Sequence, residues 1–158
     1  MIKYKVQQLQ SCPVAEFDIT YKTKPGAVRD RKVVKQSTDI AEILKEIYNT
    51  DSFEWVESFI VIYLNKANKM LGFYKISQGG ITGTVADPRI ILQCALLSNA
   101  TAIILSHNHP SGNLRPSKAD EELTQRVKAA ARYMDIQVID HIIMSTEGYY
   151  SFSDSGLL

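Results

Sequence analysis

The sequence predicts a single α/β domain in which a mixed β-sheet carries helices on both faces. Helical and strand-like hydrophobic periods follow each other along the chain with no internal repeat, and one long apolar segment suits a central strand. The chain has 158 residues, of which 45% are hydrophobic and 22% charged. These values are those of an ordinary globular domain with one core.

The N-terminal part is predicted to be a short β-like leader, residues 1–32, ahead of a domain spanning residues 33–158. Two stretches of β-type composition, Tyr4–Val6 and Phe17–Tyr21, suggest a strand pair in this leader. The basic segment 22–35 has no aromatic residues interleaved for stacking on bases, so we interpret it as a solvated loop or edge strand.

The first half of the domain is predicted to form one helix and two strands. A helix starts at Ser37, where Ser37 or Thr38 can cap it. Its apolar residues fall on one face: Ile40, Ile43, Leu44 and Ile47. Residues 56–65 are apolar on both alternating faces, which is typical of a central strand, and residues 70–76 form the next strand.

The second half is predicted to alternate between helices and strands. Asp87 and Pro88 open a helix that ends near Asn99, because aspartate caps and proline suits the first helical position. A buried strand is expected at 101–105, and a second helix begins at Ser117. Its apolar residues recur at helical spacing: Leu123, Val127, Ala131 and Met134. The last two strands are expected at 136–144 and 149–152.

Charge and composition indicate which partners and which cellular compartment to expect. Eighteen Lys and Arg against 17 Asp and Glu give a net charge of +1, which provides no strong attraction to nucleic acid or to an anionic membrane. The N-terminus lacks a signal-peptide core, the apolar runs are too short to span a bilayer, and Cys12 and Cys94 form no CxxC motif. We therefore expect a cytoplasmic protein with no membrane partner.

The stretch LSHNHPSGNLRPSKAD, residues 105–120, contains a candidate metal site. Side chains at i and i+2 of an extended segment point to the same side, so His107 and His109 can chelate one ion, with Asp120 as third ligand. Two imidazoles and a carboxylate suit Zn²⁺, although Mn²⁺ or Fe²⁺ would also be tolerated. Hydrogen-bonded histidines and a helix start at Ser117 with Asp120 in its first turn would explain the same residues, and spacing alone leaves both interpretations open.

The same stretch carries a resemblance to a known family. The pattern H-x-H, ten residues, D appears as His107-x-His109-Pro110 followed by Ser117-x-x-Asp120. Together with the runs DHIIM and SFSDSG, it resembles the RadC branch of the JAMM (MPN+/JAB) metallopeptidases, over roughly residues 33–156. The resemblance implies a JAB/MPN-type domain with a cytidine-deaminase-like architecture.

The resemblance also implies a zinc hydrolase, specifically a peptidase or isopeptidase acting on a peptide or isopeptide-linked protein. Zinc would be held by His107, His109 and Asp120. The family pattern has an upstream glutamate as general acid/base; the matching residue is Glu57, with Glu54 as the fallback. By the same analogy the Ser117 hydroxyl would bind the tetrahedral oxyanion, although a helix cap explains this serine equally well. His141 is interpreted as a structural residue or as support for the ligands.

Three other functions were weighed against the hydrolase. A zinc nucleobase deaminase would need a P-C-x-x-C motif, which neither cysteine supplies. A non-enzymatic DNA-repair-associated module is the second alternative, but longer RadC-like proteins carry an N-terminal helix-hairpin-helix-like region where this chain shows only the leader. A partner-binding module that holds metal for stability is the third. Substrate selectivity is expected to come from loops 78–84 and 113–116.

Overall fold

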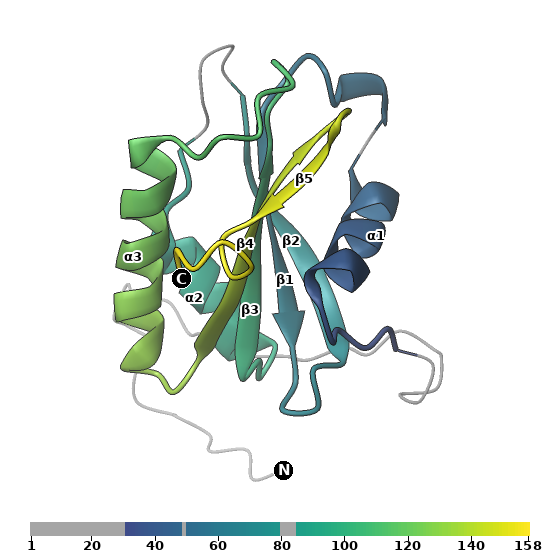
Figure 1. Ribbon diagram of the computed structural model, residues 1–158. Helices are drawn as coiled ribbons and strands as arrows, with labels where there is room; N and C mark the ends of the chain where they lie inside the picture. The colour runs from purple at the N-terminus through teal and green to yellow at the C-terminus, as the bar shows by residue number, and fades with distance from the viewer. Residues whose placement is uncertain (1–30, 49, 80–84) are drawn as a thin grey trace, which may run out of the picture.

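A computed structural model describes residues 31–48, 50–79 and 85–158 of the chain (Figure 1). In this part, five strands form one mixed sheet in the order β2-β1-β3-β4-β5. The predicted α/β class, with helices on both faces of a mixed sheet, is confirmed. The strand pair predicted in the leader lies outside the described residues, and the expected domain boundary at residue 33 stays a prediction.

The elements alternate along the chain as the hydrophobic periods predict. In order they are α1 (Ser37–Ile47), a 3₁₀ turn (Thr50–Ser52), β1 (Ser58–Leu64), β2 (Met70–Gln78), α2 (Pro88–Leu97), β3 (Ala102–Asn108), α3 (Lys118–Arg132), β4 (Gln137–Ser145) and β5 (Gly148–Ser151). The pair β3 and β4 is parallel, whereas β1–β2, β1–β3 and β4–β5 are antiparallel. The β3–α3–β4 segment is therefore a crossover unit, with α3 packed on one face of the sheet.

The sheet separates two apolar cores. On the face of α1, buried residues of the helix pack against the sheet: Ile40, Ile43 and Leu44 with Ile60, Ile62 and Ile104. On the opposite face, α2 and α3 contribute Ile91 and Val127, which pack with Val61, Ile103 and Leu105. Figure 1 shows α1 on the right of the sheet and α3 on the left. All seven residues of β1 are buried, which confirms the predicted central strand.

The predicted cap of the first helix was wrong, although its start at Ser37 was right. The helix α1 begins at Ser37 with Gln36 as its N-cap, and neither Ser37 nor Thr38 caps it. The Asp39 carboxylate accepts a hydrogen bond from the Gln36 backbone N–H at 3.2 Å, and this satisfies an amide that the first turn leaves free. The Ser37 hydroxyl is instead used in tertiary structure, since it donates to Asp154 Oδ2 at 2.6 Å.

One strand is longer than predicted, and this matters for the site. The segment expected at 101–105 extends to Asn108 as β3, so it includes His107, whereas the other strands match their predicted ranges to within two residues. Among the helices in the described part of the chain, none has the length and apolar character needed to cross a bilayer.

Candidate metal centre

The end of β3 holds two imidazoles on one side of the sheet. The His109 backbone N–H donates to the Met144 carbonyl at 2.9 Å, which extends the parallel pairing with β4 by one residue beyond the strand. The chain then turns back, with the Gly112 N–H donating to the His109 carbonyl at 3.0 Å. Gly112 has a φ of +80°, which a side chain would disfavour. The extended geometry thus continues through both histidines, as their spacing predicts.

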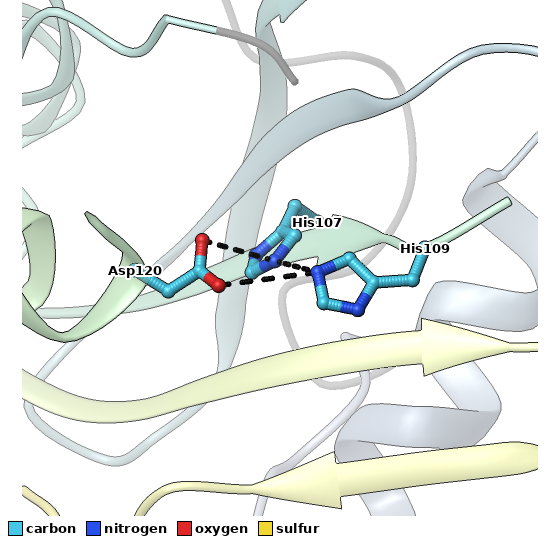
Figure 2. Close-up of side chains that lie close together, drawn as sticks. All are labelled: His107, His109 and Asp120. Atoms are coloured by element: carbon cyan, nitrogen blue, oxygen red, sulfur yellow. Dashed lines mark hydrogen bonds and ion pairs between the residues drawn. The ribbon is translucent and has the colours of Figure 1, made fainter. Parts of the chain in front are cut away.

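The start of α3 supplies the carboxylate. Ser117 is the N-cap, and its Oγ accepts from the Asp120 N–H at 3.2 Å. In return, Asp120 Oδ2 accepts from the Ser117 backbone N–H at 2.7 Å and from the Ser117 hydroxyl at 2.6 Å. This capping box fixes the Asp120 side chain in the first turn. The carboxylate points toward the imidazoles (Figure 2), with Oδ1 at 3.3 Å from His107 Nε2 and Oδ2 at 3.9 Å from His109 Nε2.

The donor atoms of these three residues fit a single metal ion. The Nε2 atoms of His107 and His109 lie 2.9 Å apart, and one ligand atom from each of the three residues lies within 4.8 Å of the others. A tetrahedral zinc ion with its usual ligand distances holds two imidazole nitrogens roughly 3.3 Å apart. His109 Nδ1 lies 2.5 Å from the Asn113 carbonyl, which can only accept, so a neutral His109 ring would carry its hydrogen on Nδ1 and its lone pair on Nε2. That lone pair points at the other donors.

The charges at the site also suit a cation. Burial raises the pKa of Asp120, but the hydrogen bond and charge of His107 and the hydrogen bonds from Ser117 outweigh it and hold the pKa below its usual range. The side chain is therefore a carboxylate at neutral pH. His141 is fully buried, and burial together with the nearby His107 lowers its pKa well below the ordinary value, so it is neutral.

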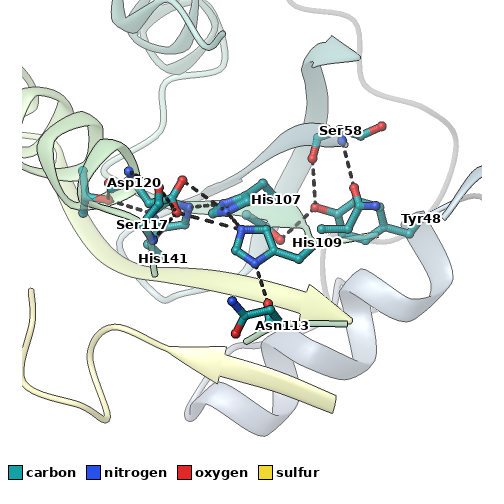
Figure 3. A network of polar contacts seen from close by, with 11 residues as sticks. Tyr48, Ser58, His107, His109, Asn113, Ser117, Asp120 and His141 are labelled. Carbon is teal, nitrogen blue, oxygen red and sulfur yellow. Dashed lines mark hydrogen bonds and ion pairs between the residues drawn. The ribbon is translucent and has the colours of Figure 1, made fainter. Parts of the chain in front are cut away.

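Behind the ligands lies a second group of polar side chains (Figure 3). His107 Nδ1 is 2.8 Å from His141 Nε2, and His141 Nδ1 is 2.6 Å from Thr124 Oγ1. His141 thus has the supporting position that its buried strand suggested. Thr124 was missed, although it follows Asp120 by one helical turn and so lies on the same face of α3.

Glu57 is placed at the site's end of the sheet. It immediately precedes β1, and its carbonyl accepts from the Gly79 N–H at 3.1 Å. Phe59, two residues further along the chain, pairs with His107 across β1 and β3, so the Glu57 backbone lies near the end of β3 that carries the ligands. Glu57 is partly exposed and is not one of the grouped metal donors. Its catalytic role, like that of Ser117, stays a prediction.

The side chain of Asn108, at the end of β3, holds the segment that precedes β1. Asn108 is fully buried, and its Nδ2 donates to the carbonyls of Phe53 and Val56 at 2.7 and 3.0 Å, while its Oδ1 accepts from the Ser58 N–H at 2.8 Å. This side chain ties the segment carrying Glu57 to β3.

The fallback, Glu54, is exposed and lines a cavity of about 350 Å³ with residues of the α1 face: Tyr48, Phe53 and Met144.

The amino-acid sequence of this chain matches a known family over most of its length. The RadC-like JAB domain matches residues 34–157. The chain belongs to the RadC-like JAB domain family. This confirms the resemblance to RadC-like JAB domains, and the five-stranded sheet with three helices in the described part of the chain is consistent with a JAB/MPN-type domain.

Several bacterial relatives of this RadC-like protein carry the uninformative name UPF0758 protein. One from Flavobacterium johnsoniae is 35% identical over 144 residues, which cover 91% of this chain and 62% of the relative. One from Porphyromonas gingivalis is 46% identical over 65% of this chain and 45% of the relative. UPF0758 protein YfjY of Escherichia coli K12 is 43% identical over 65% of this chain and 64% of its own length. The match thus spans about half to two thirds of these relatives.

Proposed function

We propose that this RadC-like JAB domain is a zinc-dependent metallohydrolase that cleaves peptide or isopeptide bonds in a protein substrate. The observation that supports the proposal is the convergence of three ligand types, two imidazoles and a carboxylate, from His107, His109 and Asp120. Three protein ligands leave a coordination position for water or substrate, as in catalytic rather than structural zinc sites. The proposal includes the cytoplasmic location expected from the composition.

In this proposal His107, His109 and Asp120 would hold zinc, which would supply Lewis-acid activation of a water molecule and of the scissile carbonyl. Glu57, at the start of β1, takes up the proton of the attacking water and passes it to the nitrogen of the leaving amine. Ser117 would bind the developing oxyanion only if its hydroxyl turned away from Asp120 Oδ2, to which it donates at 2.6 Å. The structure therefore supports the capping role of Ser117 more directly.

The test compares two single substitutions of the same chemistry, Glu57→Gln and Glu54→Gln. Zinc content is measured on the purified chain, and turnover is measured on a library of peptide and isopeptide substrates. We expect zinc binding in both variants, a loss of at least about 100-fold in turnover for Glu57→Gln, and wild-type turnover for Glu54→Gln. His109→Ala should lose both zinc and activity.

Other results would count against the proposal in distinct ways. Equal turnover of wild type and Glu57→Gln would remove the catalytic role of that carboxylate. Zinc binding without turnover of any library member would instead favour a module that keeps its metal for stability and binds a partner. Failure of the wild-type chain to bind zinc would contradict the metal centre itself.

A further inference from the structure

Three buried groups form a hydrogen-bonded chain that leads away from the candidate metal centre. It runs from His107 Nδ1 to His141 Nε2 at 2.8 Å, and from His141 Nδ1 to Thr124 Oγ1 at 2.6 Å. The Thr124 hydroxyl lies a further 2.6 Å from the Asp120 carbonyl, to which it donates. All three side chains are at most 1% exposed, so water does not substitute for a missing partner at low cost.

A metal ion on His107 would fix the direction of every hydrogen bond in this chain. A neutral imidazole that binds metal through Nε2 carries its hydrogen on Nδ1, so His107 would donate to His141 Nε2. His141, which is also neutral, would then carry its hydrogen on Nδ1 and donate to Thr124 Oγ1. The Thr124 hydroxyl hydrogen therefore needs another acceptor.

The Asp120 carbonyl is that acceptor. A threonine hydroxyl accepts and donates at once, and here it accepts from His141 while donating to the backbone of the third ligand. One hydroxyl thus connects the ring of His107 with the helical turn that carries Asp120. A side chain of the same shape without the hydroxyl would leave the His141 Nδ1–H buried without a partner.

We propose that Thr124 is a positioning residue of the metal centre, which acts through His141 to hold His107 in the tautomer that presents its Nε2 lone pair to the ion. The inference rests on the proposed zinc site and adds a determinant of its affinity. Without the hydroxyl, His141 takes the Nε2–H tautomer and donates to His107 Nδ1, which forces the hydrogen of His107 onto the metal-binding nitrogen.

The first experiment measures zinc affinity of the full chain by competition with a chromophoric chelator. Thr124→Val removes the hydroxyl and keeps the shape, whereas Thr124→Ser keeps the hydroxyl. We expect an affinity about 10- to 100-fold weaker for the valine variant and within about threefold of wild type for the serine variant. Unfolding in excess chelator shows whether each variant is folded before zinc is added.

The second experiment needs no variant. The chain has three histidines, all in this cluster, so a long-range ¹H–¹⁵N spectrum of the zinc-loaded wild type contains only three imidazoles. We expect the hydrogen of His141 on Nδ1, and an Nε2–H tautomer there would overturn the proposal.

The outcomes separate this inference from the metal centre. If wild type and both variants bind zinc equally tightly, the role of Thr124 is overturned while the metal centre stands. If the wild type binds no zinc, both the metal centre and the role of Thr124 are contradicted. Weak zinc binding by Thr124→Val and tight zinc binding by Thr124→Ser, together with an Nδ1–H tautomer of His141, would support both the metal centre and the role of Thr124.

Discussion

Two partly buried aspartates of this protein have opposite electrostatic settings. Asp120 faces His107 and the capping serine, and its pKa lies below the usual range. Asp140 accepts from the Ser151 hydroxyl at 2.7 Å and from the Ser153 backbone N–H at 3.0 Å, and the nearby Asp154 carboxylate adds a like charge. Burial outweighs these hydrogen bonds and raises the pKa of Asp140. The difference shows why Asp120, and not any buried carboxylate, suits a cation.

The raised pKa of Asp140 predicts a pH effect on stability. A group whose pKa is higher in the folded state stabilises the fold fully below its unfolded pKa of about 4, and this contribution is lost as pH rises through the folded value. Asp140→Asn keeps an oxygen acceptor but does not titrate. We expect the free energy of unfolding of Asp140→Asn, relative to wild type, to increase between pH 4 and pH 6. Urea unfolding in excess chelator measures it; a constant or decreasing difference would contradict the assignment.

At the scale of secondary-structure elements, the ligands were predictable because they lie in one local unit. His107 and His109 share a face as long as β3 continues, and Asp120 is in the first turn of the next helix. The three ligands could therefore be predicted from two local features, the alternation of side chains along a strand and the start of a helix. Glu57 comes from another strand, and its place depends on the antiparallel register of β1 and β3, which the residues do not encode locally.

The face of the sheet on which His141 lies could not be predicted, because it depends on a β-bulge. β4 carries one extra residue, Ile139, opposite the step from Ile103 to Ile104. Beyond it, His141 pairs with Leu105 and lies on the face of the metal ligands. Without the bulge, the His141 side chain would lie on the α1 face of the sheet instead. An isoleucine fits either core, so nothing in the alternation reveals the shift.

Asn108 connects two elements, and its removal should destabilise the protein. Asn108→Ala leaves the carbonyls of Phe53 and Val56 and the N–H of Ser58 without their partner. We expect the free energy of unfolding to fall by about 2–4 kcal/mol, because buried polar groups lose their hydrogen bonds. The control is Asn113→Ala, an exposed position where we expect a change of about 1 kcal/mol or less. Chemical denaturation compares the two, and similar losses would contradict the structural role of Asn108.

At the scale of the whole molecule, the candidate centre lies where the parallel pair β3 and β4 ends and the crossover helix α3 begins (Figure 1). A metal ion held there would join the two ends of the loop that leads from β3 into α3. The arrangement of helices on both faces of a mixed sheet followed from the hydrophobic periods, because the predicted apolar faces are largely buried, although Met134 is 51% exposed. The substrate does not follow from the fold, since the same architecture serves different sites.

The central claim is that His107, His109 and Asp120 bind one zinc ion. The most direct measurement is an anomalous difference map at the zinc edge, from crystals of the full chain grown with zinc and from His109→Ala crystals prepared alike. We expect, in the wild type alone, a peak about 2.0–2.2 Å from both Nε2 atoms and one oxygen of Asp120. A well-ordered wild-type structure with no zinc among these three side chains would contradict it.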